Sequence, residues 1–247
     1  MEFFGEVLAW YGDPANWTGN DSIPVRLWEH LSLSVASLLA GLAIALPIGL
    51  YIGHTGRGAR LAVAVSNIGR AVPSLGWLGI AYPISTGLFH RGGIGFLPAF
   101  IGLVALAIPP VVTNTYTGLR EVDADLRETA RGMGMREFQV LTQVEVPVAL
   151  TVILAGIRVS AVAVVATAPL AALVGGGTLG SYILEGLALS DEVRVFAAAV
   201  LVALLAILTE LGFAWLQRRA VSPGLARPKD QPFAEPAQAA GPGALAS

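Results

Sequence analysis

The chain has 247 residues, of which 55% are hydrophobic and only 13% are charged, and its net charge is −2. Soluble domains carry about a quarter charged residues, so this composition predicts a membrane protein rather than a very apolar soluble one. The slightly negative net charge excludes a broad basic surface for nucleic acid. The lack of cysteine excludes thiolate chemistry, and the three scattered histidines do not have the spacing of metal ligands.

Five apolar runs along the chain predict transmembrane helices. A bilayer core of roughly 30 Å requires about 20 apolar helical residues. The runs cover residues 31–53, 61–88, 94–119, 148–174 and 195–217. Pro73 and the pair Pro109–Pro110 predict kinks or local unwinding within the second and third runs. We therefore expect an all-helical integral membrane protein with five spans.

The segments outside these spans predict the orientation of the chain. Basic residues follow the first, third and fifth spans: Arg57, Arg60, Arg120, Arg127, Arg131, Arg136, Arg218, Arg219, Arg227 and Lys229. The alternate side carries acidic residues, among them Asp13, Asp21, Glu29, Glu185, Asp191 and Glu192, and of the arginines only Arg26, Arg91 and Arg194. The positive-inside rule then places residues 1–30 outside, as a turn-rich stretch, and residues 218–247 in the cytoplasm, as a disordered tail rich in Pro, Ala and Gly.

A charged loop, residues 120–147, separates the third and fourth spans. Helix formers occupy residues 123–131, Gly132 and Gly134 interrupt them, and residues 136–144 resume the pattern. This predicts a short helix, a glycine bend and a second short helix. Leu126, Ala130 and Met133 fall on one helical face. Such an amphipathic helix either lies on the lipid surface or binds a partner.

The same loop carries a spaced motif. It consists of Glu128, Thr129, Ala130 and Gly134, and then Val144, Val146 and Pro147. This resembles the EAA motif of the membrane subunits of ABC importers, which reads E-A-A, three residues, G, nine residues, I-x-L-P. The spacing matches throughout, and the departures are Thr129 in place of Ala and two valines in place of Ile and Leu.

Further stretches resemble the osmoprotectant branch of these permeases, which takes up glycine betaine, choline, carnitine and similar compounds. They are RAVPSLGWLGIAYP (70–83), NTYTGL (114–119), AGIR (155–158) and ALVGGGTLG (172–180). The resemblance covers roughly residues 31–217. It implies a type I importer permease fold with a cytoplasmic coupling helix, and as partners ABC ATPase subunits, a second identical or related permease and an external solute-binding protein.

The resemblance also implies which residues contact the ATPase. They are Arg127, Glu128, Thr129, Ala130, Gly132, Gly134, Met135, Phe138 and Pro147. A carboxylate at Glu128 can orient a helix end or pair with a cation on the partner. Gly134 permits a tight turn, and Pro147 can begin the next span, where a missing N–H costs little.

The chain carries no phosphate-binding loop of its own. Its glycine clusters at residues 53–60 and 175–182 lack the lysine of that motif, and neither follows a soluble strand. We therefore expect a separate subunit to hydrolyse ATP, and we expect this chain to be no enzyme and to need no cofactor or metal.

Three charged residues fall inside the predicted spans. Arg70, Arg158 and Glu210 lie toward the cytoplasmic ends of their helices. Because a charge within a bilayer is costly, we expect Glu210 to pair with Arg158 or with Arg70. The alternative is that both arginines extend to the inner headgroups.

Other residues are candidates for a solute path or gate. Trp77, Tyr82 and Tyr116 offer aromatic faces that attract a quaternary ammonium group, although membrane aromatics also pack or anchor helices. Pro73 and Asn114 lie in the same two spans. Near the outer face, Gly175, Gly177 and Gly180 belong either to an external gate or to a flexible loop.

The sequence as a whole predicts the permease subunit of an ATP-driven osmoprotectant importer. A permease for methionine or another small solute is the nearest alternative, because importers share the coupling motif. An ion-coupled carrier working alone would need more membrane acids or an internal duplication. A membrane enzyme would need a nucleophile with its base, or a metal cluster, and neither stands out.

Overall fold

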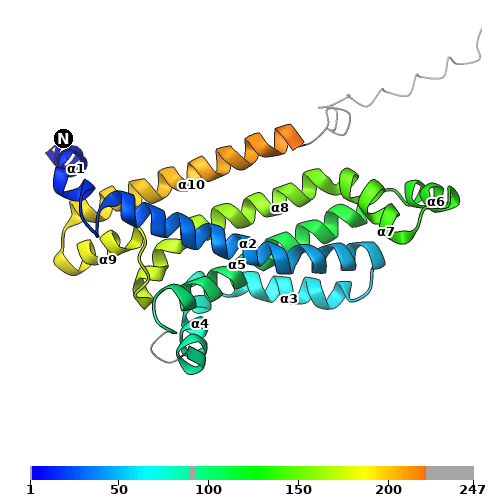
Figure 1. The fold of residues 1–247 in the computed structure, drawn as a ribbon, viewed down its shortest axis with the longest axis horizontal. Coiled ribbons are helices and arrows are strands. Elements are labelled where there is room, and N and C mark those ends of the chain that lie inside the picture. The colour runs from blue at the N-terminus through cyan, green and yellow to red at the C-terminus, as the bar shows by residue number, and fades with distance from the viewer. Residues whose placement is uncertain (1, 90–92, 221–247) are drawn as a thin grey trace, which may run out of the picture.

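A computed structural model describes residues 2–89 and 93–220, without the side chains at positions 61, 62, 65, 70 and 89. All regular structure in this described part is helical, as predicted. Four segments are long and apolar enough to cross a bilayer: α2 (Ile23–Thr55), α5 (Phe96–Arg120), the run Glu137–Val174, which contains α8 (Val146–Thr167), and α10 (Glu192–Ala220). They run along the long axis of the molecule (Figure 1).

The helix α5 lies at the centre of this bundle, with α2 and α8 packed along it. Small residues recur every fourth position on the contact face of α2, at Gly41, Ala45, Gly49 and Gly53, and all four are buried. A Cβ atom added at Gly49 would lie 2.7 Å from Cβ of Thr115 on α5. In lipid, where hydrophobic burial does not drive helices together, this close backbone approach supplies packing contacts.

The second predicted span differs from the prediction of one helix. It consists of α3 (Ala59–Ala71) and α4 (Ser74–Phe89), which break at Val72 and Pro73. Val72 is extended, with φ −70° and ψ 122°, because the ring of a following proline disfavours the helical conformation. Each piece is shorter than the roughly 20 residues that a span requires. The count of five spans therefore stays a prediction.

The prolines of α5, in contrast, do not interrupt the helix, which continues through Pro109 and Pro110. Side chains bond backbone carbonyls in this turn. Asn114 Nδ2 donates to the carbonyl of Pro110 at 2.8 Å, and Ser160 Oγ of α8 donates to that of Ala107 at 2.9 Å. The carbonyls that Pro109 and Pro110 leave without a helical donor are those of Ala105 and Leu106, so these two bonds support the same stretch of helix without replacing the missing ones.

The N-terminal stretch is more helical than predicted. It contains α1 (Glu2–Gly12), and α2 begins at Ile23 rather than near residue 31. Arg26, in this first part of α2, forms ion pairs with Asp21 and, at 2.9 Å, with Glu29. These pairs reduce the free-energy cost of placing charges in a helix whose apolar run begins only later. At the other terminus α10 continues to Ala220, so residues 218–220 are helical, and the rest of the predicted tail lies outside the described residues.

The tight contact between α2 and α5 gives a direct test of this packing. Gly49→Ala forces Thr115 or the helices to shift, and we expect it to destabilise the protein by about 1–3 kcal/mol, as overpacked cores do. Gly212→Ala in α10 is the matched control, since no atom lies within 4 Å of its added Cβ. Thermal unfolding in detergent should show a lower midpoint for Gly49→Ala alone. Equal midpoints would contradict the packing.

Candidate functional site

The charged loop forms a structured segment at one end of the bundle, opposite α1 and α9 (Gly180–Leu189) (Figure 1). It consists of α6 (Ala124–Gly132), α7 (Glu137–Gln139) and the π-helix η3 (Val140–Glu145), which leads into α8. Asp123 caps α6 by accepting a hydrogen bond from the backbone N–H of Asp125 at 3.0 Å. The predicted order of helix, bend and helix is confirmed.

The bend after α6 is a Schellman motif centred on Gly134. Its φ of +85° is left-handed, which disfavours residues with a Cβ. The N–H of Met135 donates to the carbonyl of Ala130 at 3.2 Å, and the N–H of Gly134 donates to that of Arg131 at 2.9 Å. The motif thus stops α6 and turns the chain toward α7, so the predicted turn at Gly134 is confirmed.

The outer surface of this segment, α6 to α7, is apolar in part. Leu126, Met133 and Phe138 are exposed by 43%, 71% and 73%. Ala130, expected on the same face as Leu126, is instead buried. Glu128, Thr129, Gly132 and Pro147 are exposed, and Met135 is half-buried. Large apolar side chains exposed beyond the apolar spans make this segment a candidate contact surface.

Arg127 faces the bundle rather than the surface. Its guanidinium donates a hydrogen bond to the carbonyl of Leu119 at the end of α5. Its Nε lies 3.1 Å from Oε1 of Glu145, which is close enough for an ion pair. These two atoms are not aligned as a hydrogen bond. Glu145 is fully buried, and its Oε2 lies 2.6 Å from Nδ1 of His54 on α2. The motif gave no role to Glu145 or His54. In the sequence, the one indication of either residue is that it is a polar residue beside a long apolar run.

A second pair reinforces the segment. Arg131 Nε donates to Oε1 of Glu137 at 2.9 Å, and a hydrogen bond from NH2 to Oε2 accompanies it. This hydrogen bond lowers the pKa of Glu137 below its ordinary value and raises that of Arg131. A carboxylate with a lowered pKa contributes stability above its ordinary pKa and loses it as the pH falls through the lowered value. The pair is therefore intact at neutral pH.

The charges inside the spans form one of the two predicted pairs. Arg158 on α8 and Glu210 on α10 form a bidentate pair, with Nε 2.8 Å from Oε2 and a second contact from NH2 to Oε1. The pair joins α10 to α8. The side chain of Arg70 in α3 lies outside the described residues.

Of the candidates for a path, the structure brings Tyr82 and Gly175 together. Both line a cavity of about 370 Å³ between α4 and the end of η4 (Ala168–Val174), with Leu75, Leu78, Gly79, Ile94, Leu173 and Val174. Tyr82 is 40% exposed. The cavity therefore has an aromatic wall.

The remaining candidates are not gathered there. Trp77 donates its indole N–H to the carbonyl of Gly69 at 3.2 Å, across the break that Pro73 makes. Asn114 packs against Gly156 of α8, and Tyr116 is half-buried in α5.

Two of the glycines expected either in an external gate or in a flexible loop, Gly177 and Gly180, lie close to neighbouring atoms. A Cβ on Gly177 would lie 2.3 Å from the Glu29 carboxylate, and one on Gly180 would lie 2.0 Å from the carbonyl oxygen of Pro169. The backbone of Pro169 therefore leaves no room for a side chain at Gly180, whereas a side chain at Gly177 would displace the end of the Glu29 side chain.

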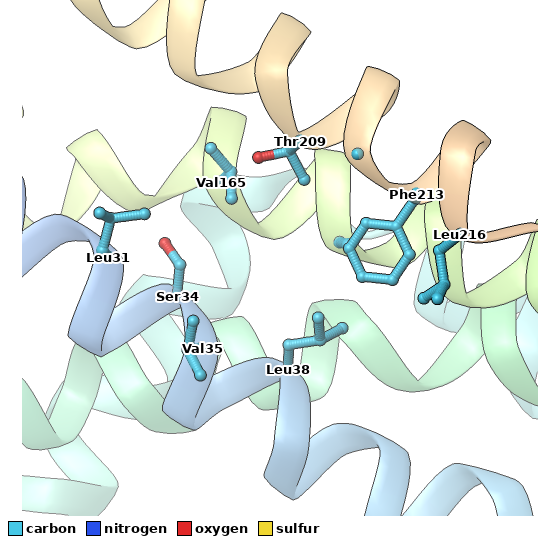
Figure 2. Close-up of a pocket in the computed structure, with 10 residues that line it drawn as sticks. Leu31, Ser34, Val35, Leu38, Val165, Thr209, Phe213 and Leu216 are labelled. Carbon is cyan, nitrogen blue, oxygen red and sulfur yellow. The ribbon is translucent and has the colours of Figure 1, made fainter.

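A separate apolar cavity of about 260 Å³ opens between α10 and the helices α2 and α8. Leu31, Val35 and Leu38 face Phe213 and Leu216 across it, and Ser34 and Thr209 are its hydroxyl-bearing residues (Figure 2). This lining suits hydrocarbon rather than a charged solute.

Comparison with known proteins agrees with these features. Residues 45–222 match the family described as binding-protein-dependent transport system inner membrane component. The chain belongs to this family. It is 37% identical over 195 residues to the carnitine transport permease protein OpuCB of Listeria monocytogenes, covering 79% of this chain and 86% of that one. It is 33% identical to the choline transport system permease protein OpuBB of Bacillus subtilis, covering 86% and 95%.

The fold has a solved counterpart in the MetNI methionine ABC transporter, in an inward-facing conformation. The TM-score is 0.70 with 24% identity, over 79% of this chain and 94% of that one. The resemblance inferred from the EAA-like motif is thus confirmed, and the chain is a multi-pass membrane permease component with the type I ABC importer fold.

The pair Arg158–Glu210 makes a prediction about charge inside the membrane. Reversing either residue places like charges together, and an unpaired charge inside a bilayer is costly, up to about 2.5–3.5 kcal/mol at a helix centre. We expect Arg158→Glu or Glu210→Arg alone to lower the thermal midpoint and the transport rate. Combining both should restore most of each. Failure of the double variant to recover would indicate that Arg158 is stabilised by lipid headgroups instead.

Proposed function

We propose that this chain forms the translocation pore of an ATP-driven importer for osmoprotectants such as glycine betaine, choline or carnitine. The observation that carries the proposal is the segment from α6 to α7, which holds the EAA-like motif and exposes large apolar side chains at one end of the bundle. A permease without an ATPase partner would leave this surface in contact with water.

Separate subunits supply the remaining activities. A partner ATPase binds α6 and α7 and hydrolyses ATP, and a second copy of this chain or a related permease completes the pore. An external binding protein delivers the solute. The basic residues near α6 and at the end of α10, Arg218 and Arg219, support a cytoplasmic position for this end, which leaves the N-terminus outside.

Transport then follows from movement of the coupling segment. When ATP draws the two ATPases together, α6 and α7 move with them, and the pore changes from inward-facing to outward-facing. Glu128 and Thr129, which are exposed on α6, are placed to contact the ATPase directly.

The solute class rests on the relatives and on one aromatic residue. The named carnitine and choline permeases share 33–37% identity with this chain, whereas the methionine transporter shares the fold at 24%. Tyr82 is the pathway aromatic that reaches a cavity, and its ring face can attract a quaternary ammonium cation. The binding protein supplies most of the selectivity.

Crosslinking tests the coupling surface. Phe138 and Trp28 are each 73% exposed. Phe138 lies on α7, whereas Trp28 lies near the start of α2, at the opposite end of the bundle. With a photoreactive amino acid at either position, we expect Phe138 to crosslink to the ATPase and Trp28 not to. An ATPase crosslink from Trp28, or none from Phe138 in an active complex, would contradict the proposal.

Reconstitution tests the solute. The permease, reconstituted with its partner ATPase and binding protein, should take up radiolabelled glycine betaine, choline or carnitine into liposomes only with ATP present. Methionine should not be imported. Uptake of methionine would assign the chain to another solute, and uptake driven by an ion gradient through this chain alone would make it a secondary carrier.

A further inference from the structure

Among the residues that the structure describes, the most completely buried charged side chain is Glu145, which stands between Val144 and Val146 of the EAA-like motif at the junction of η3 and α8. Its relative exposure is 0%, although it lies only two residues before Pro147, which is exposed. A carboxylate without water must be paired, because desolvation otherwise disfavours the charged form strongly. Its partners therefore reveal which elements it holds together.

Those partners come from two other elements. Oε2 of Glu145 lies 2.6 Å from Nδ1 of His54, in the last turn of α2, and Oε1 lies 3.1 Å from Nε of Arg127 on α6. The Arg127 guanidinium also bonds the carbonyl of Leu119 in α5. One buried carboxylate thus links α8, α2 and α6, and through Arg127 it reaches α5.

The network continues outward to α7. Nε2 of His54 lies 3.2 Å from Oε2 of Glu137, and Glu137 bonds Arg131 of α6. His54 therefore bridges two carboxylates, one buried and one exposed. These five residues, Arg127, Arg131, Glu137, Glu145 and His54, form a continuous chain of ionisable side chains in contact across the base of the segment.

The backbone at Glu145 is also unusual. Val140–Glu145 is a π-helix, in which the N–H of Val146 bonds the carbonyl of Leu141 five residues earlier. Single π turns within longer helices occur frequently at functional sites. The wider turn lies between α7, on the contact surface, and α8, inside the membrane. Glu145 lies at the junction where η3 ends and α8 begins.

We propose that Glu145 is a positioning residue that clamps α6 to the adjoining ends of α2 and α8, so that a displacement of α6 moves both spans. This rests on the proposed function, in which an ATPase displaces α6. Without the clamp, α6 follows the ATPase while the spans lag behind, and ATP is hydrolysed without a matching movement of solute.

The test is the number of ATP molecules hydrolysed per solute imported, measured with the complete complex in liposomes. Glu145→Gln removes the charge and keeps the shape. We expect uptake to fall by roughly tenfold while hydrolysis falls far less, so that the ratio rises by nearly the same factor. Glu145→Asp, which retains the charge, should recover part of the coupling. Glu121→Gln is the matched control, because Glu121 is an exposed carboxylate on the same loop, and its ratio should stay at the wild-type value.

The outcomes separate the possibilities. If uptake and hydrolysis fall in proportion for Glu145→Gln, the residue is merely structural and the inference is overturned. If that variant does not fold, Arg127→Gln is the second test, because it breaks the contact with Glu145 from α6, outside the membrane bundle. It should also raise the number of ATP molecules hydrolysed per solute imported. An unchanged number overturns the inference. If the wild-type permease binds no ATPase subunit, the proposed function itself is refuted.

Discussion

The free-energy cost of an unpaired charge away from water is the constraint on which this structure depends. In a bilayer or a packed interior, such a charge must find a partner on a neighbouring helix. Among the described residues, such contacts join Arg158 to Glu210 between α8 and α10, and Glu145 to His54 and Arg127 at the base of α6. Because each joins elements far apart in the chain, the charges define which helices move together.

Packing divides the bundle in a complementary way. The small residues of α2 allow it to approach α5 closely, and Gly156 of α8 meets Asn114 of α5 in the same manner. Around α10 the packing is looser, with an apolar cavity between it and α2 (Figure 2). The helices α2, α5 and α8 therefore form a compact unit, and the charged cluster attaches α6 to that unit. Such an arrangement suits a permease whose spans are displaced from one end.

Much of this could be predicted from the sequence, because hydropathy and spacing are local properties. The long apolar runs gave α2, α5, α8 and α10, and the glycines at 132 and 134 gave the bend after α6. The shared depth of Arg158 and Glu210 was enough to suggest their pairing. The spacing of the EAA-like motif led to the family.

What could not be predicted depends on contacts between distant residues. His54 and Glu145 are 91 positions apart, so no local pattern joins them. The family resemblance implies that Arg127 contacts the ATPase, but its guanidinium faces Glu145, a carboxylate in another element. The early start of α2 was missed for a similar reason, since hydropathy counts Arg26 and Glu29 as isolated charges although they pair with each other.

The central claim is that α6 and the adjoining end of α8 move as one body. Spin labels at Asp125 on α6 and Val148 on α8, both exposed, would report the distance between them in lipid nanodiscs containing the full complex. The account predicts the same distance distribution without nucleotide and with ATP bound to a hydrolysis-deficient ATPase. A clear shift of that distance on ATP binding would contradict it.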